Sequence, residues 1–211
     1  MQRRLQPELL DSLPPHHPDA QHSRRDLRLI NGVMGNHRWF TRTLPPLLAA
    51  GEPVLEVGAG TGELGSRLAT RGVTIAGLDV APRPPDWPGE WNQCDLRAFE
   101  GFDRFPVVIG NLIFHQFTSG ELVALGATLR RTARLIVACE PQRWRVSQGL
   151  FAVVAPLFGA NRVTLHDARV SIDAGFLRHE LPEIFGLDRK LWEIRCDSTP
   201  LGAYRMVAVR R

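Results

Sequence analysis

Pro-Val-Leu-Glu-Val-Gly-Ala-Gly-Thr-Gly-Glu-Leu-Gly, residues 53–65, is the stretch that decides the fold. Val54, Leu55 and Val57 predict a short buried strand, the glycines after it allow a sharp turn, and a helix is expected from Glu63. This order of strand, glycine turn and helix start is typical of a loop that binds a nucleotide-type cofactor. Glu56, the acid inside the strand, then bears on which cofactor the loop accepts.

The sequence of this loop is compatible with two cofactors, a dinucleotide and S-adenosylmethionine. Residues 60–65 also satisfy G-x-G-x-x-G, the dinucleotide fingerprint in which a helix N-terminus holds a pyrophosphate. In that interpretation Glu56 and Glu63 would place carboxylates near a dianion in a partly desolvated pocket, where like charges are costly. S-adenosylmethionine carries a sulfonium and an ammonium and no phosphate. The charge argument therefore favours S-adenosylmethionine over NAD.

The same residues carry a family resemblance. Glu-Val-Gly-Ala-Gly-Thr-Gly, residues 56–62, resembles motif I of the class I S-adenosylmethionine-dependent methyltransferases, especially the small-molecule branch that includes the ubiquinone and menaquinone methyltransferases. The resemblance covers residues 53–141 with specific motifs and the flanks only in general layout. It implies S-adenosylmethionine as the cofactor, S-adenosylhomocysteine as its product, and cofactor contacts at Glu56, Gly58, Ala59, Gly60 and Gly62.

Further acids follow at the expected places. Residues 73–79 predict a second apolar strand that ends in Asp79, nineteen positions after Gly60, where a carboxylate can accept from ribose hydroxyls of either an adenosyl group or NAD. The resemblance adds Val80 beside it, and implies that Asp95 takes the adenine amino group while Leu96 packs on the ring. A lone aspartate such as Asp95 would otherwise be interpreted as a helix N-cap.

The acceptor side is expected after the fourth predicted strand, residues 105–111, because ligands of open α/β sheets bind at the carboxyl ends of strands. The resemblance implies that the backbone of Asn111 holds the methionine amino group. His115, four residues on, is a candidate general base for a phenolic proton, with a helix-capping or packing role as the alternative. His37 and His166 are the other catalytic candidates. The adjacent His166 and Asp167 are not expected to form a dyad, because neighbouring side chains usually diverge.

Several further residues have two interpretations each. Arg143 and Arg145 could hold an acidic group of the substrate or form a solvated helix start. A set of aromatic residues could line an apolar pocket or belong to the core: Trp39, Phe40, Trp144, Phe151 and Phe158. A missing base would not exclude catalysis, since methyl transfer depends mainly on alignment of nucleophile, methyl and sulfur.

Alternating strands and helices predict an α/β fold: a Rossmann-like, doubly wound, seven-stranded sheet, mostly parallel with the last strand antiparallel. Residues 1–50 are expected to form an N-terminal arm and helical cap, and residues 51–211 the methyltransferase domain. The first nineteen residues are too broken by proline for regular structure. Beyond the fifth strand, helices are expected at residues 143–158 and 171–185, and a closing antiparallel strand pair at residues 191–195 and 204–209.

Composition excludes several classes of protein. The 211 residues suffice for one core, and the net charge of +4 rests almost wholly on arginine, with Lys190 the only lysine. That skew is typical of a GC-rich bacterial gene, so it does not predict a nucleic-acid partner. Cys94, Cys139 and Cys196 lack metal-binding or disulfide spacing, so no metal is expected. There is no membrane-span or signal pattern, and we expect a cytoplasmic protein.

The sequence therefore predicts an enzyme that transfers a methyl group from S-adenosylmethionine by in-line displacement to a small molecule, with a phenolic or polyketide-like hydroxyl as the expected acceptor. Three alternatives stay open: an RNA or protein methyltransferase, a non-catalytic S-adenosylmethionine-binding protein, and a dinucleotide oxidoreductase. The expected oligomeric state is a monomer or homodimer.

Overall fold

The computed structural model of the chain describes residues 2–14, 16–157 and 159–211. Its strands form one seven-stranded sheet with the order β3-β2-β1-β4-β5-β7-β6. β7 runs antiparallel to both of its neighbours, and the remaining strand pairs are parallel, as the sequence predicted. The strands span β1 Val54–Val57, β2 Ile75–Asp79, β3 Glu90–Gln93, β4 Val107–Asn111, β5 Leu135–Pro141, β6 Trp192–Ser198 and β7 Ala203–Arg210.

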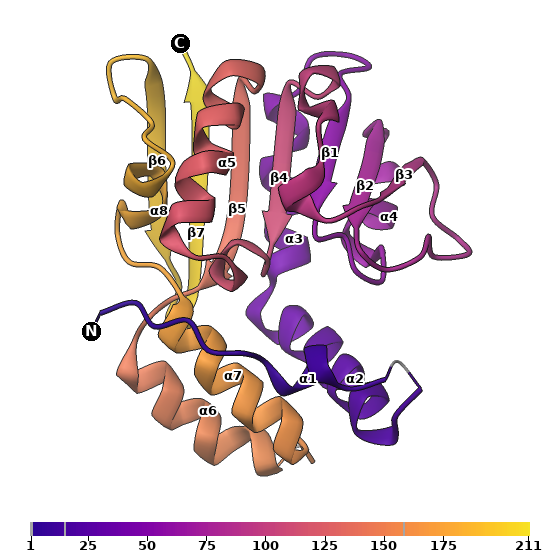
Figure 1. Ribbon diagram of the computed structural model, residues 1–211, viewed down its shortest axis with the longest axis vertical. Coiled ribbons are helices and arrows are strands. Elements are labelled where there is room, and N and C mark those ends of the chain that lie inside the picture. Colours follow the sequence, from indigo (N-terminus) through magenta and orange to yellow (C-terminus); the bar gives the residue numbers. More distant parts are fainter. Residues whose placement is uncertain (1, 15, 158) are drawn as a thin grey trace.

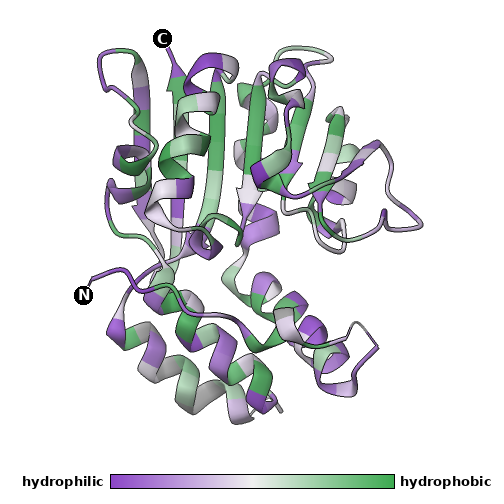
Figure 2. Cartoon of the chain, viewed as in Figure 1, coloured by the Kyte–Doolittle hydropathy of each residue, from purple (hydrophilic) through white to green (hydrophobic). Residues whose placement is uncertain are grey.

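Helices cover both faces of this sheet (Figure 1). α3 (Asn36–Thr43) and α4 (Glu63–Ala69) pack on one face, and α5 (Ser119–Thr132) and α8 (Glu180–Ile184) pack on the other, each over its own buried apolar cluster. Figure 2 shows the central strands hydrophobic over most of their length, as expected for parallel strands buried on both faces. A sheet that is apolar on both faces needs a layer of helices on each face, which gives the doubly wound architecture.

Four further helices gather at the edge where the parallel strands end (Figure 1): α1 (Leu9–Ser12), α2 (Pro18–Met34), α6 (Arg145–Leu157) and α7 (Arg162–Ala174). The Thr164 hydroxyl donates to buried Asp26 at 2.7 Å, which joins α7 to α2. The cap therefore contains two helices from between β5 and β6 as well as N-terminal ones, although the sequence predicted a cap only within residues 1–50. No described helix has the length and apolar character needed to cross a membrane.

The predicted helix over residues 171–185 is wrong. Asn161 caps the start of α7 by accepting from the backbone N–H of Thr164, and the helix ends at Ala174. The next residue, Gly175, lies against β5 so closely that a Cβ there would be 2.2 Å from the carbonyl oxygen of Pro141. The chain stays extended at this contact, and a separate short helix, α8, follows.

The prediction of an irregular first nineteen residues is also partly wrong. α1 forms within this arm, and α2 begins at Pro18 with His17 as its cap. Proline fits the first turn of a helix, because its missing N–H would have no partner there. After α3, Pro45 and Pro46 lie in a 3-10 turn, η1 (Pro45–Leu47).

Three glycines make room for one buried tryptophan between α4 and the sheet. A Cβ at Gly65 would lie 2.2 Å from the Trp87 ring, and those at Gly62 and Gly77 would lie 2.8 and 2.9 Å from it. The Trp87 indole N–H donates to the Glu90 carbonyl at 2.8 Å, so the ring is fixed in this position. The third glycine of G-x-G-x-x-G therefore accommodates an indole ring.

We predict that Gly65→Ala lowers the free energy of unfolding by about 1–3 kcal/mol, because the added methyl group overpacks a fixed ring. Gly120→Ala is the matched control: it lies in α5, a Cβ there would meet no atom within 4 Å, and the change should be neutral or slightly stabilising. Urea denaturation measures both. Combining Gly65→Ala with Trp87→Leu should cost less than the two single changes added together; simple additivity would contradict the contact.

Candidate cofactor and acceptor site

The sheet order places a topological switch point between β1 and β4, whose connections lead to opposite sides of the sheet. Glu56 on β1, Asp79 at the end of β2 and Asn111 at the end of β4 all lie at or near the carboxyl ends of these neighbouring strands. The structure thus brings the predicted cofactor residues of three strands to one edge of the sheet.

The glycine loop after β1 is tight on one side and open on the other. Gly58, Gly60 and Gly62 have φ angles of 65°, 53° and 75°, which disfavour residues with a side chain. A Cβ at Gly58 would lie 2.5 Å from the Ile113 side chain, whereas one at Gly60 would meet only a carbonyl oxygen at 4.0 Å. Ala59 is buried. A ligand can therefore approach the backbone at Gly60.

Asp79 ties this loop to the one after β2. Its carboxylate accepts from the backbone N–H of Gly60 at 2.7 Å and from that of Ala81 at 2.8 Å. The neighbouring Val80 side chain is 68% exposed, an uncovered apolar group beside a carboxylate. This pairing suits a nucleoside, whose ribose hydroxyls donate and whose base has an apolar face.

Glu56 is a buried acid with an unused oxygen. Burial raises the pKa of its carboxyl group to about 8, despite a hydrogen bond from the Gly65 backbone that lowers it. Its Oε2 atom has no hydrogen-bond partner among the described residues. Because a nearby cation favours the ionised form of a carboxyl group, this site suits a positively charged ligand.

Asp95 has the capping role that the sequence left open. Its side chain accepts from the backbone N–H of Arg97 at 2.8 Å at the start of η2 (Leu96–Ala98), and the Arg97 guanidinium bonds the same carboxylate. Leu96 packs at the border of the core. Contacts of these two residues with an adenine ring remain a prediction.

Glu140 is the functional residue that sequence reasoning missed. This fully buried carboxylate at the end of β5 accepts from the backbone N–H groups of Ile113 at 3.0 Å, Phe114 at 2.8 Å and His115 at 3.2 Å, and bonds His115 Nδ1 at 2.7 Å. It thus holds the turn after β4, including η4 (Phe114–Gln116). The available signal was an acid within a buried strand, since buried charges need partners.

His115 lies between two carboxylates. Its Nε2 faces Glu8 of the arm at 3.4 Å, opposite the bond to Glu140. Burial alone lowers the pKa of His115, but hydrogen bonds and charges from Glu140 and Glu8 raise it to about 9. With the arm in this position the ring is protonated and engaged at both nitrogens. His115 can accept a proton only after Glu8 moves away.

The other predicted histidines lie elsewhere. His37 is on α3, and burial followed by the charge of Arg67 on α4 lowers its pKa. His166 Nδ1 does bond Asp167 at 3.0 Å, contrary to the expectation that these neighbours diverge. The Asp167 carboxylate also accepts from the backbone of Leu9 and Leu10, so it holds α1 against α7. The structure does not bring the three histidines together.

The remaining candidates divide between core and surface. Phe40 is fully buried and packs edge-on against Trp39, with ring centroids 4.9 Å apart. Trp144 is 39% exposed, and Phe158 lies outside the described residues. Arg143 was predicted to hold an acidic group of the substrate or to lie in a solvated helix start. Instead it is buried, and its guanidinium donates to both carboxylate oxygens of Glu180 at 3.0 Å.

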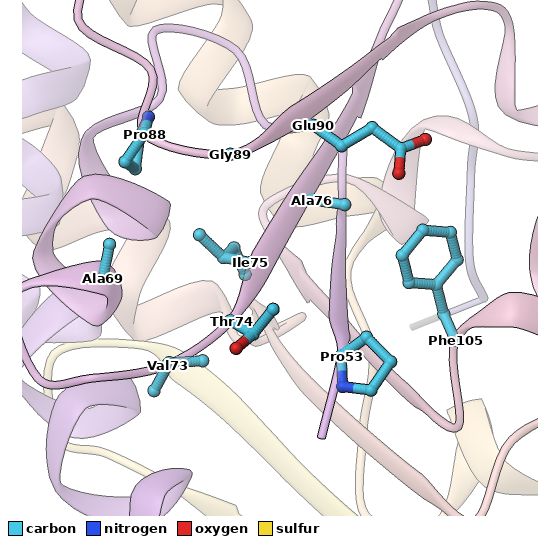
Figure 3. A pocket seen from close by; sticks show the side chains of 10 residues that line it. All are labelled: Pro53, Ala69, Val73, Thr74, Ile75, Ala76, Pro88, Gly89, Glu90 and Phe105. Carbon is cyan, nitrogen blue, oxygen red and sulfur yellow. The ribbon is translucent and has the colours of Figure 1, made fainter. Parts of the chain in front are cut away.

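Two pockets differ in their chemistry. One of about 230 Å³ lies under the arm, between Glu8, His115 and Ser171. The other, of about 240 Å³, lies near the amino ends of β1 and β2, away from the glycine loop (Figure 3). Its lining is mostly apolar or backbone, and its one carboxylate, Glu90, is paired with Arg104. The pocket under the arm is therefore the better candidate for an acceptor site.

Comparison with known proteins identifies the fold. No protein-family model and no curated protein matches the sequence. Solved structures do match it. The plantazolicin methyltransferase BpumL, in complex with a triazolic desmethylPZN analogue and SAH, has a TM-score of 0.73 and 10% identity over 96% of this chain and 93% of that chain.

Two further matches have lower TM-scores. Magnesium protoporphyrin IX methyltransferase (ChlM) from Synechocystis PCC 6803 with bound SAH has a TM-score of 0.56 and 16% identity, covering 96% of this chain and 91% of that one. Human N-acetylserotonin methyltransferase in complex with SAM has a TM-score of 0.55 and 13% identity, covering 95% and 61%. The chain has the fold of S-adenosylmethionine-dependent methyltransferases.

The buried histidine predicts a specific pH dependence of stability. With a pKa raised from 6.5 to about 9, folded His115 binds its proton more tightly than the unfolded chain does. This contribution to the free energy of unfolding is fully present below about pH 6.5 and is lost as the pH rises through about 9. Wild type should thus lose more stability across this window than His115→Gln, by urea denaturation. His16→Gln, in the exposed arm, should keep the wild-type profile; parallel profiles for all three proteins would contradict the pairing.

Proposed function

We propose that this chain is an S-adenosylmethionine-dependent methyltransferase that acts on a small-molecule acceptor. The observation that carries the proposal is the unused, buried Oε2 of Glu56 beside a glycine loop that is open at Gly60, in a fold shared with methyltransferases crystallised with SAM or SAH. A cation-seeking acid at this position fits a sulfonium and ammonium cofactor.

In this proposal each strand end contributes one contact to the cofactor. Asp79 accepts from the ribose hydroxyls, and exposed Val80 covers a face of the nucleoside. Asp95 and Leu96 lie where the adenine is expected, the backbone of residues 58–62 follows the cofactor chain, and Asn111 faces its methionine end. When bound, S-adenosylmethionine supplies an electrophilic methyl carbon attached to a positively charged sulfur.

The chain's own contribution is alignment of the acceptor and control of one proton. Glu140 fixes the turn after β4, so that Ile113 contacts the glycine loop while His115 lines the pocket under the arm. After Glu8 leaves His115 Nε2, one of the two charges that hold the ring protonated is gone. His115 can then lose its proton to solvent and take the proton of an acceptor hydroxyl, with Nδ1–H still bonded to Glu140.

The proposed acceptor is a phenolic or polyketide-like hydroxyl. Plantazolicin, N-acetylserotonin and magnesium protoporphyrin IX, which name the enzymes of matching fold, support a small-molecule acceptor. The choice of a hydroxyl rests on His115 as the candidate base. The proposal places the enzyme in a bacterial cytoplasm as a monomer or homodimer. His37 and His166 have no catalytic role in it, because neither borders the pocket under the arm.

The three alternative functions fit the described residues less well. An RNA substrate would need a basic groove beside the turn after β4, but Arg3 donates to the carbonyls of His115 and Phe117, and Arg97 is paired with Asp95 and Glu121. A dinucleotide would bring phosphates close to Glu56. A non-catalytic protein would bind the cofactor without turning it over.

Transfer of a tritiated methyl group from S-adenosylmethionine tests the proposal, with a panel of phenols, bulk RNA and protein as acceptors. We expect labelling of a phenol and loss of at least about tenfold in cofactor affinity in Asp79→Ala, because a hydrogen-bonded charge is removed. Asp86→Ala, an exposed aspartate of the following loop, is the matched control and should behave as wild type. Labelling of RNA or protein alone, or cofactor binding without any transfer, would contradict the proposal.

A further inference from the structure

One oxygen of Glu8 faces two hydrogen-bond donors in the pocket under the arm. Its Oε1 accepts from the Ser171 hydroxyl on α7, and the same atom lies 3.4 Å from Nε2 of the His115 ring. The side chain of Glu8 is 14% exposed and that of His115 is 5% exposed. Two donors from different elements, a cap helix and the turn after β4, therefore converge on a single anionic oxygen of the arm.

The side chain of Glu8 is not needed to hold the arm in place. Glu8 precedes α1 at the cap position, but its side chain makes no capping bond there. Asp167 on α7 accepts instead from the backbone N–H groups of Leu9 and Leu10. Arg3 fastens the first part of the arm, because its guanidinium donates to backbone carbonyls of α7 and of the turn after β4. The Glu8 side chain can therefore turn out of the pocket while the backbone of the arm stays where it is.

The rest of the pocket suits an aromatic ring. Apolar surface comes from the arm and from α7, and the pocket holds about 230 Å³. The apolar lining residues are Leu5, Pro7, Val170 and Ala174. Among the described residues that line the pocket, His115 is the only one that can carry a positive charge. A ring between apolar walls with an anionic oxygen on the two donors is a phenolate.

We propose that Glu8 occupies the position of the acceptor's nucleophilic oxygen, and that Ser171 and His115 are the two donors that bind this oxygen as a phenolate. The inference rests on the proposed function and narrows its acceptor to phenols acidic enough to ionise in this pocket. It assigns a binding role to Ser171 and makes Glu8 an internal competitor of the acceptor. An alkyl hydroxyl stays neutral, so it would not displace a carboxylate from a protonated ring.

The charges at this subsite change in the order that turnover needs. An acceptor that arrives as a phenol gives its proton to His115, which has first released one proton to solvent, and the phenolate then replaces the Glu8 carboxylate. During transfer a bond forms from the acceptor oxygen to the methyl carbon while the carbon–sulfur bond breaks. The negative charge on oxygen and the positive charge on sulfur both disappear, and His115 keeps its proton. Because the methyl ether has no charge to pair with the ring, Glu8 can return as the product leaves.

A phenol and its methyl ether test the inference on the unmodified protein. 4-Nitrophenol and 4-nitroanisole share the same ring, but only nitrophenol ionises, and its phenolate has a visible absorption of its own. Absorbance titration of the wild-type protein measures the apparent pKa of the bound nitrophenol. We expect binding to lower this pKa by about one unit or more, since the two donors favour the anion, and we expect about tenfold weaker binding of nitroanisole. An unchanged or raised pKa would overturn the inference.

Three variants assign the binding to this subsite. Glu8→Gln keeps the size of the side chain and removes its charge, so affinity for nitrophenolate should rise about tenfold. Ser171→Ala, made in the Glu8→Gln background so that the competitor stays constant, should lower this affinity about tenfold and leave nitroanisole binding unchanged. Asp173→Asn is the matched control: it removes an acid from the same helix, but that carboxylate bonds Gln148 on α6, so affinity should stay at the wild-type value.

The outcomes separate the inference from the proposed function. The inference would be overturned by no gain in affinity in Glu8→Gln, by an equal gain in Asp173→Asn, or by loss of both ligands together when Ser171 is changed. Methyl labelling of a phenol would still support the proposed function in each of these cases. Binding of nitrophenolate as expected, with no transfer to any acceptor, would contradict the proposed function alone. The titration of wild type decides the inference even if a variant does not fold.

Discussion

The buried carboxylate of Glu140 organises the functional edge of this molecule. It gathers three successive backbone N–H groups and one ring of the turn after β4, the turn that the glycine loop, the arm and the cap all contact. Within this turn Leu112 has a φ angle of 58°, which is costly for a residue with a side chain, and its N–H donates to Cys139 on β5. The strained turn persists because two groups of β5 accept hydrogen bonds from it: the backbone carbonyl of Cys139 and the side-chain carboxylate of Glu140.

Two different surfaces result from that single constraint. On one side Ile113 presses against Gly58, which couples the turn to the cofactor loop. On the other side His115 faces the arm, where Glu8 accepts from Ser171 and pairs with the ring, and Arg3 donates to the carbonyls of His115 and Phe117. One turn thus contacts both the glycine loop and the pocket under the arm.

Sequence patterns predicted those features of the fold that depend on residues close together in the chain. The strands, the glycine loop and the acids after β1 and β2 could be placed from the sequence, because apolar runs and glycines fix them within a few residues. Contacts between distant segments could not be foreseen. The end of α7 at Ala174 depends on Pro141, Arg143 pairs with Glu180 thirty-seven positions away, and Glu140 matters only because β5 ends beside the turn. The hydrogen bond from the Asn111 side chain to that of Asn31 joins two positions that no spacing rule connects.

The most direct test of the account is calorimetric titration of the wild-type protein with S-adenosylhomocysteine and with NADH. A binding site built around a buried acid should exclude a pyrophosphate and accept the adenosyl amino acid. We therefore expect saturable binding of S-adenosylhomocysteine with one site per chain and no detectable binding of NADH. Binding of NADH with no binding of S-adenosylhomocysteine would contradict the methyltransferase assignment and return the glycine loop to the dinucleotide class.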